Sequence, residues 1–162
     1  MTKEELGELI MQEQESFYRI AKTIIHEDAD VSDALSETIV RAFASLHQLR
    51  HDRYAKTWFV RILLNECYKT LKSRNRLIYM EEAELISGEG SADDRDYSEL
   101  YICLEQLPEE TRLCIVLYYM EGYSVKEVAK LLDTTTSSVK NRLLRGRKRL
   151  KELLDVPVEQ LA

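Results

Sequence analysis

Apolar side chains recur at intervals of three and four residues along three stretches of the first half of the chain, 3–26, 31–48 and 54–75. At this spacing they fall on one face of a helix, so the pattern predicts three amphipathic helices that bury these faces together. The expected buried face of the first helix consists of Leu6, Leu9, Ile10, Phe17, Ile20, Ala21 and Ile24. That of the second consists of Leu35, Ile39, Ala42 and Leu46, and that of the third of Phe59, Ile62, Leu63, Cys67 and Leu71.

Two further helices, with a tight polar turn between them, are predicted near the end of the chain. Ser124 and Glu127 have the spacing of a capping box, which starts the first of these helices. Residues 133–136 end it, because their short hydroxyl and carboxylate side chains compete for backbone hydrogen bonds. The second helix has an apolar face of Val139, Leu143, Gly146 and Leu150, and an opposite face of Ser138, Asn141, Arg145 and Arg149. This pattern predicts a helix-turn-helix whose second helix suits a DNA major groove.

The chain is expected to be all-α, with two small helical domains. No stretch alternates apolar and polar residues as a half-buried strand does, and the chain has only five glycines and two prolines. Residues 80–99 are acidic and hold too few apolar residues for a core of their own, which is typical of a flexible linker. The predicted domains are therefore 1–79 and 100–162.

The formal net charge of −6 is unusual for a protein that binds DNA, but the charge is unevenly distributed. Residues 41–79 carry nine basic and two acidic groups, and residues 136–151 carry seven basic and no acidic groups, so each block has a charge of +7. Residues 1–40 and 80–99 each have a charge of −7. The two basic blocks predict two nucleic-acid contacts, and the acidic regions predict at least one surface for another kind of partner.

The third helix carries a basic stripe that contains one amide, and the stripe consists of Arg61, Asn65, Lys69, Lys72 and Arg76. These residues lie three or four positions apart, so they share one side of the helix and could follow a nucleic-acid backbone. The preceding loop, 47–58, mixes cations with Tyr54 and Trp58, a combination that suits the stacking of unpaired bases. For Trp58 an alternative stays open, since a tryptophan at a helix start also packs into a core.

The polar side of the second helix suggests a contact with another protein. Asp33, Glu37 and Arg41 lie there with Val40 and Ala44 among them, and a fully solvated face does not require these apolar residues.

Catalytic or metal chemistry is not expected. His47 and His51 lie four residues apart, but no third ligand is near them in the sequence. The three cysteines lie in apolar helical contexts and form no CxxC pair, so we expect buried thiols in a reducing cytoplasm. No signal peptide and no long apolar run is present, and a cytoplasmic protein is expected.

The ordered set of these segments resembles the extracytoplasmic-function (group 4) sigma factors of the bacterial sigma-70 family. In the first unit the resemblance rests on FYRIAKTII (17–25), DADVSDALSETIVRAF (28–43) and TWFVRILLNECYKTLKSR (57–74). In the second unit it rests on LEQLPEETRLCIVLYYMEGYSVKEVAKLL (104–132) and SSVKNRLLRGRKRLKELL (137–154). It implies a sigma-2-like domain, a linker and a sigma-4-like helix-turn-helix domain, in a protein that directs RNA polymerase to promoters.

The resemblance also implies roles for individual residues. The surface for core RNA polymerase would consist of Asp33, Glu37, Val40, Arg41 and Ala44. The module that opens the −10 element and captures a flipped base would consist of Arg50, Arg53, Tyr54, Lys56, Trp58, Arg61, Asn65, Lys69 and Lys72. The −35 reader would consist of Ser137, Ser138, Lys140, Asn141, Arg142, Arg145 and Arg149.

The implied partners are promoter DNA, core RNA polymerase and an anti-sigma factor. The polymerase would be bound at the clamp helices of its largest subunit and at its flap, and anti-sigma factors of this family are often membrane-bound. No cofactor, no metal and no small-molecule substrate is implied.

Five positions depart from the family pattern. Ser36 stands where glutamine is usual, Ser137 and Ser138 stand where glycine and threonine are usual, and Asn141 replaces a common serine. The changes on the reading face are where we expect this protein's own promoter preference. Gly146 replaces an alanine, which should weaken its helix by up to ~1 kcal/mol.

An ordinary helix-turn-helix repressor or activator, with an N-terminal sensor or dimerisation domain, is the alternative function. A sensor domain should be apolar and pocketed around residues 50–76, whereas this segment is cationic and follows an aromatic loop.

Overall fold

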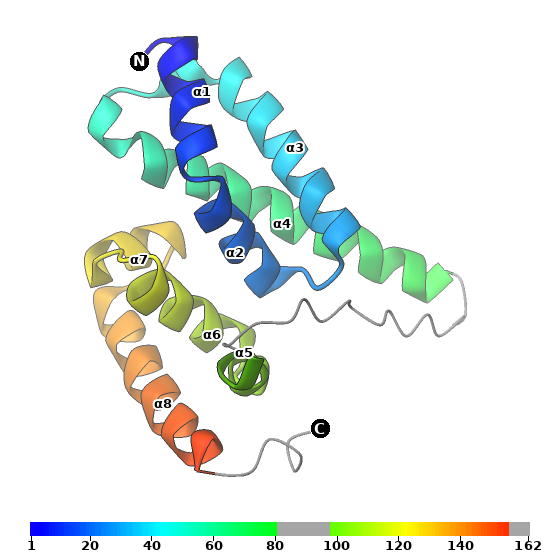
Figure 1. Cartoon of the computed structure of the whole chain (residues 1–162), viewed down its shortest axis with the longest axis vertical. Coiled ribbons are helices and arrows are strands. Elements are labelled where there is room, and N and C mark those ends of the chain that lie inside the picture. Colours follow the sequence, from blue (N-terminus) through cyan, green and yellow to red (C-terminus); the bar gives the residue numbers. More distant parts are fainter. Residues whose placement is uncertain (81–97, 156–162) are drawn as a thin grey trace. The chain divides into compact units, whose positions relative to one another are not determined.

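The computed structural model describes residues 1–80 and 98–155, with the side chains of 1–74 and 99–155. Every element within these residues is helical, which confirms the all-α prediction (Figure 1). The chain divides into two compact units, Met1–Gly90 and Ser91–Ala162. Residues 81–97 of the predicted linker lie outside the described residues.

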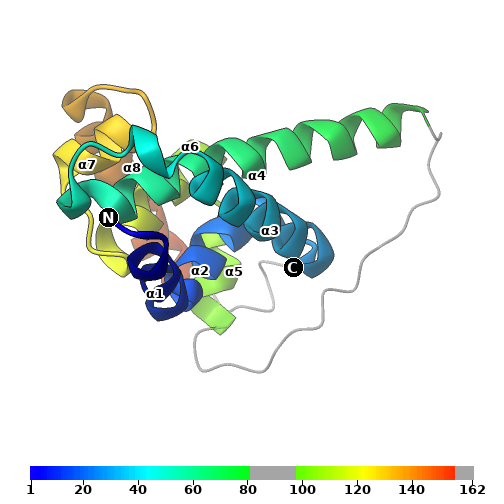
Figure 2. The ribbon, with the colours of Figure 1, turned by 90° about the horizontal axis from the view of Figure 1, so that it is seen from above.

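The N-terminal unit is built on three mutually packed helices, α2, α3 and α4, with α1 before them. In chain order its elements are α1 (Lys3–Gln12), α2 (Gln14–Ile24), α3 (Asp28–Ala44), the 3-10 turns η1 (Leu46–Gln48) and η2 (Asp52–Tyr54), and α4 (Ala55–Met80). α4 packs along both α2 and α3 and extends beyond them (Figure 2). In the core, Phe17 of α2 stacks on Phe59 of α4 with ring centroids 4.4 Å apart.

The predicted helix 3–26 is interrupted, so that prediction is wrong at one position. Glu13 separates α1 from α2, with φ −106° and ψ 10°. Its carboxylate forms an ion pair with Lys56 Nζ at the start of α4, at 2.9 Å. The helix is therefore interrupted where it contacts a distant segment, and the periodicity of the local sequence cannot predict such a contact.

α3 buries a different face from the one expected. The fully buried residues are Val31, Ala34, Thr38 and Ala42, and of these only Ala42 belongs to the expected face. Leu35 and Ile39, which were expected inside, are only half-buried. Small side chains let α3 approach α4 closely, and Thr38 is tolerated there because its hydroxyl donates to the Ala34 carbonyl at 2.6 Å.

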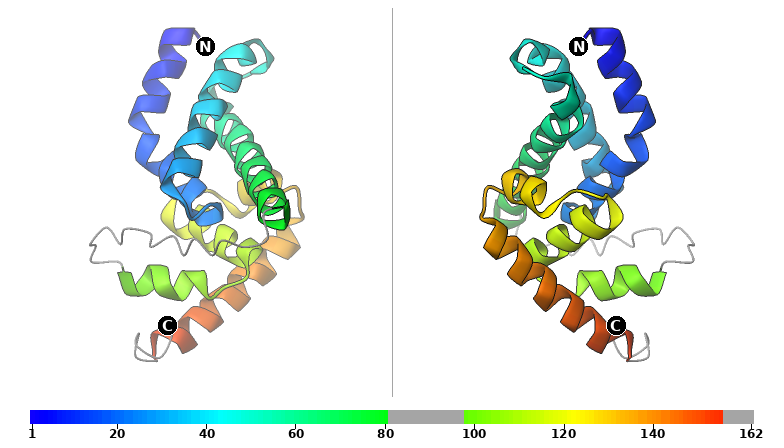
Figure 3. Two further views of the ribbon diagram at one scale, coloured as in Figure 1. Left: turned by 90° about the vertical axis from the view of Figure 1, so that its right-hand side faces the viewer. Right: turned by 90° about the vertical axis from the view of Figure 1, so that its left-hand side faces the viewer.

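The C-terminal unit is organised around its last helix. Its elements are α5 (Ser98–Glu105), α6 (Glu109–Ile115), the π-helical turn η3 (Val116–Met120), α7 (Val125–Leu131) and α8 (Thr136–Leu154). α8 packs against α5, α6 and α7 (Figure 3). Its buried residues are Val139, Leu143, Gly146 and Leu153, so the predicted apolar face is confirmed except that Leu150 is half-buried.

The turn between α7 and α8 has the predicted helix-turn-helix form. The capping box is present, since Glu127 N–H donates to Ser124 Oγ and Ser124 N–H donates to Glu127 Oε1, each at 3.1 Å. Asp133 has φ 53°, a left-handed conformation that short polar side chains tolerate. Thr135 then caps α8 by accepting from Ser138 N–H at 3.1 Å.

The three cysteines, Cys67, Cys103 and Cys114, are free thiols in the core, as predicted. None of the helices in the described ranges is long and apolar enough to cross a membrane.

Candidate nucleic-acid interfaces

One side of α4 carries most of the predicted −10 residues. Arg61, Asn65, Lys69 and Lys72 are all exposed along it. Trp58 lies on the same side, two turns before Asn65, and is half-buried, so both readings of its role stay open.

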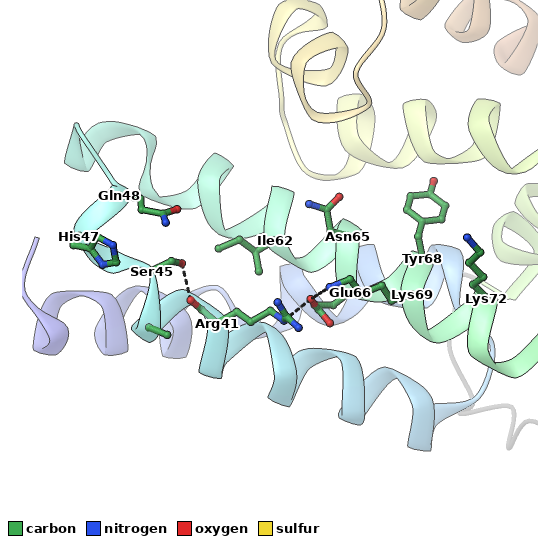
Figure 4. A pocket seen from close by; sticks show the side chains of 11 residues that line it. Arg41, Ser45, His47, Gln48, Ile62, Asn65, Glu66, Tyr68, Lys69 and Lys72 are labelled. Carbon is green, nitrogen blue, oxygen red and sulfur yellow. Dashed lines mark hydrogen bonds and ion pairs between the residues drawn. The ribbon is translucent and has the colours of Figure 1, made fainter.

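An open groove of about 650 Å³ runs between α3 and α4 in the N-terminal unit. It is lined by Arg41, Ala44, Ser45, His47, Gln48, Ile62, Asn65, Glu66, Tyr68, Lys69 and Lys72 (Figure 4). Three residues of the predicted basic stripe are thus brought beside two residues of the predicted polymerase surface. The groove joins segments that are up to about 30 residues apart in sequence, which helical spacing could not show.

Two groove residues were missed from the sequence. Tyr68 is 40% exposed and points to the same side of α4 as Asn65 (Figure 4). Its spacing of three residues after Asn65 and four before Lys72 was the available signal. In the sequence Glu66 is one of only two acids in a basic block, and its position directly after the candidate base-binding amide was the available signal.

Glu66 is the centre of an ion-pair network that joins α3 to α4. Its carboxylate, 7% exposed, lies 2.7 Å from Arg41 Nε and 3.3 Å from Lys69 Nζ. Arg41 Nε also lies 3.3 Å from the Glu37 carboxylate, one turn earlier on α3 (Figure 4 shows the Arg41–Glu66 pair). A candidate polymerase contact and a candidate DNA contact therefore share one buried carboxylate.

The loop before α4 lies largely outside this groove. Arg53 sits over the Tyr54 ring, 4.7 Å from its centroid, and the His51 ring meets the same tyrosine edge-on. Tyr54 and Arg50 are exposed. Lys56 forms an ion pair with Glu13 and does not project away from the helices.

The predicted polymerase surface is an exposed stripe on α3. Asp33, Glu37 and Ala44 are exposed, and Val40 is 63% exposed between them. Arg41 is exposed as well, but its guanidinium reaches towards α4.

The predicted −35 residues lie mainly on the outward side of α8. Ser137, Lys140, Asn141, Arg145 and Arg149 are exposed, and Ser138 is half-buried. Arg149 pairs with Glu152 at 3.3 Å on the surface. Leu144, 59% exposed on the same side, was not predicted, although it lies three residues after Asn141.

Arg142 is placed differently from the other α8 cations. It is 23% exposed and pairs with Glu110 of α6 at 3.2 Å. Burial raises the pKa of the nearby Cys114 thiol, and the Arg142 cation offsets part of that rise. Its guanidinium is thus turned towards α6, and a DNA contact from it stays a prediction.

Both halves of the chain match regions of one protein family. Residues 9–77 match the family model for sigma-70 region 2, and residues 97–150 match the model for sigma-70, region 4. RNA polymerase sigma factor SigV of Bacillus subtilis (strain 168) is 26% identical over 151 residues, which cover 93% of this chain and 91% of SigV. ECF RNA polymerase sigma factor SigM of Mycobacterium tuberculosis (strain H37Rv) is 28% identical over 151 residues, covering 91% of this chain and 76% of SigM.

Solved structures share the fold. The sigma factor RpoE from Bartonella quintana, in complex with the anti-sigma factor NepR, has a TM-score of 0.80 at 22% identity, covering 94% of this chain and 98% of RpoE. CnrH, in complex with the cytosolic domain of CnrY, has a TM-score of 0.69 at 24% identity, covering 95% and 90% of the two chains. Because both region models match in order across most of the sequence, the chain belongs to the sigma-70 family, as an extracytoplasmic-function sigma factor.

Proposed function

We propose that this protein binds core RNA polymerase and directs transcription initiation at promoters whose −35 and −10 elements are read by its two units. The observation that carries the proposal is that each unit matches one sigma-70 region and each holds one exposed cationic helix. A repressor with an N-terminal sensor is not favoured, because the region 2 match covers 9–77, where a sensor would lie.

The C-terminal unit is proposed to read the −35 element as a duplex. A helix of this kind enters the major groove, where arginine and asparagine side chains make the commonest specific hydrogen bonds to base edges. Arg145 and Asn141 are one turn apart on the exposed side of α8 and are the proposed base contacts. Lys140 and Arg149 are the proposed phosphate contacts that position the helix.

The N-terminal unit is proposed to hold the opened −10 element. Extruding a base costs a few kcal/mol of unstacking, which stacking and edge hydrogen bonds in a pocket can offset. The α3–α4 groove supplies an aromatic ring in Tyr68, an amide in Asn65 and cations in Lys69 and Lys72. The residues of loop 47–58 outside the groove are proposed to follow the displaced strand.

The exposed stripe of α3 is proposed to bind the polymerase, with Asp33, Glu37 and Val40 as its centre. The flap of the polymerase is the proposed contact of the C-terminal unit. We also propose a cytoplasmic location and regulation by an anti-sigma factor, since one similar structure is a sigma factor in complex with an anti-sigma factor and another is CnrH in complex with the cytosolic domain of CnrY. The proposed role requires no catalytic residue in this chain.

Transcription in a reconstituted system tests the proposal. Core polymerase and the purified protein are incubated with a broad promoter library, and run-off products are sequenced. We expect products that start at a defined promoter class and that are absent with core polymerase alone. A library without any product dependent on the protein would overturn the proposal.

A further inference from the structure

A carboxylate forms part of the floor of the α3–α4 groove, where the proposed ligand is a polyanion. The cations that line the groove are Arg41, Lys69 and Lys72, whereas Glu66 is the one acid among its lining residues. Glu66 is 7% exposed, while Asn65 beside it is exposed on the rim. A negative charge at this depth repels phosphate, so its presence needs a separate explanation.

Stability alone does not supply that explanation. Removing a carboxylate from water costs several kcal/mol, and a well-packed apolar residue is often as good or better at the same place. The two cations that pair with Glu66 also approach the same oxygen of its carboxylate. Arg41 Nε and Lys69 Nζ both make their closest approach to Oε1, so Oε2 is the oxygen better placed to accept from a further donor.

An ionised carboxylate oxygen is an acceptor only, and here it is held in place by two cations. A group that enters the groove and bonds to Oε2 must therefore donate a hydrogen. Cytosine and adenine both carry an exocyclic amino donor beside a ring-nitrogen acceptor, and the pairing of a carboxylate with cytosine N4 is an established mode of base reading. Thymine carries no amino group, and carbonyl oxygens flank its single N–H donor.

We propose that Glu66 is a specificity-determining residue of the −10 site, which selects an unpaired cytosine or adenine over thymine through Oε2. This inference rests on the proposed function, because it takes the groove as the place where an unpaired base is held. Asn65 on the rim donates to the ring nitrogen of the same base, and Tyr68 offers a stacking face. Lys69 thereby has two roles, since it fixes Glu66 and also attracts the backbone of the strand. The groove volume of about 650 Å³ lies within the usual range for small-ligand sites, about 300–1,000 Å³.

The first experiment changes the DNA and leaves the protein as it is. Holoenzyme is bound to promoter templates with a pre-opened −10 region, in which each unpaired non-template position carries in turn each of the four bases. The preferred base is then replaced by the analogue that lacks only its amino group, 2-pyrimidinone for cytosine or purine for adenine. At one position we expect cytosine or adenine to bind about tenfold better than thymine, and the analogue to lose that advantage.

The second experiment changes the carboxylate. Glu66→Gln keeps the size of the side chain but can present an amide donor, so the preference over thymine should fall to about twofold or less. Glu27→Gln is the matched control, because it removes an acid at the N-cap of α3 that also pairs with a cation of α4, Arg74, but lies outside the groove. It should leave the base preference unchanged. Thermal unfolding of both variants is measured, and if Glu66→Gln does not fold, the analogue experiment decides alone.

The outcomes separate this inference from the proposed function. Holoenzyme that binds and opens promoters with equal affinity for thymine, cytosine and adenine at every unpaired position would overturn the inference and leave the proposed function standing. Equal binding of the amino-free analogue would overturn it as well. A protein that forms no functional holoenzyme would overturn the proposed function itself.

Discussion

The two cationic helices of this protein present their candidate DNA contacts in opposite ways. α8 carries Asn141 and Arg145 on an outward, convex side, where a single helix supplies the candidate contacts. α4 carries Asn65 on the rim of a groove, whose other wall is α3 and whose floor includes Glu66. A convex surface suits a duplex groove, whereas a concave one suits a single base removed from its stack.

The two sites therefore depend on the fold to different degrees. The α8 surface requires only that one helix be held by its apolar face. The α4 groove requires that α3 and α4 keep their spacing, through the small residues of α3 and the Arg41–Glu66 pair. Changes in the core of the N-terminal unit should therefore affect −10 function before they affect −35 binding.

A substitution in the core of one unit should unfold that unit and leave the other folded. Phe59→Ala removes a fully buried ring that stacks on Phe17, and should destabilise the N-terminal unit by about 3–5 kcal/mol. The single tryptophan, Trp58, lies in this unit, so its fluorescence reports the unfolding there. Circular dichroism on the same sample follows both units.

The counterpart in the C-terminal unit is Leu143→Ala, which should cost about 2–5 kcal/mol there and leave the tryptophan transition in place. If either substitution shifted both transitions equally, the two units would not unfold independently. They could then not be treated as two separate DNA-binding domains.

The next effect separates the two kinds of DNA contact. Arg145→Ala should weaken holoenzyme binding to a −35 duplex by roughly 5- to 150-fold, the equivalent of about 1–3 kcal/mol for a lost base contact. Asn65→Ala should leave that binding unchanged and reduce promoter opening, measured by permanganate reactivity of unpaired thymines. Similar behaviour of the two variants in both assays would contradict the division between a convex and a concave reader.

The same contrast explains what the sequence could and could not predict. The helix-turn-helix was predictable almost residue by residue, because its capping box, its turn and the two faces of α8 are local patterns. The groove was not, because it depends on which residues of α3 meet α4. The expected face of α3 was wrong, since leucine and isoleucine lie at its edge while Ala34 and Thr38 fill the contact. Glu66 was missed for the same reason, because its partner Arg41 lies 25 residues earlier and on another helix.

A smaller effect of opposite sign is expected at two helical glycines. A Cβ at Gly146 would lie 2.9 Å from two side-chain carbons of Ile115 and 3.0 Å from Thr111, where α8 crosses α6. Gly146→Ala should therefore destabilise the C-terminal unit by about 1 kcal/mol, despite the better helix propensity of alanine, since overpacking typically costs about 1–3 kcal/mol. The family's usual alanine would thus be unfavourable here.

Gly7→Ala is the matched control in α1. Its Cβ would meet only Phe43, at an ordinary contact distance of 4.0 Å, so the propensity gain of up to about 1 kcal/mol should appear as stabilisation of the N-terminal unit. Both values are obtained from urea unfolding. If Gly146→Ala also stabilised its unit, the contact between α6 and α8 would be more adaptable than its spacing implies.

The smallest effect concerns alkaline pH and compares a cysteine in each unit. Burial, with a further contribution from Glu66, raises the pKa of Cys67 from 9.0 to about 12. The folded state thus keeps a proton that the unfolded state loses, so this contribution to stability is complete below pH 9 and is lost as the pH rises towards 12. By pH 10 the N-terminal unit should lose about 1 kcal/mol relative to pH 8, a loss that should be absent in Cys67→Ala.

At Cys114 the Arg142 cation opposes the effect of burial, so the difference between wild type and Cys114→Ala should change less over the same range. The measurement is urea unfolding at pH 8, 9 and 10, with each variant compared to wild type at the same pH so that lysine and tyrosine titration cancels. An equal pH response for the two cysteines would show that the cation next to Cys114 does not stabilise its thiolate, and that the buried chemistry of the two units is alike.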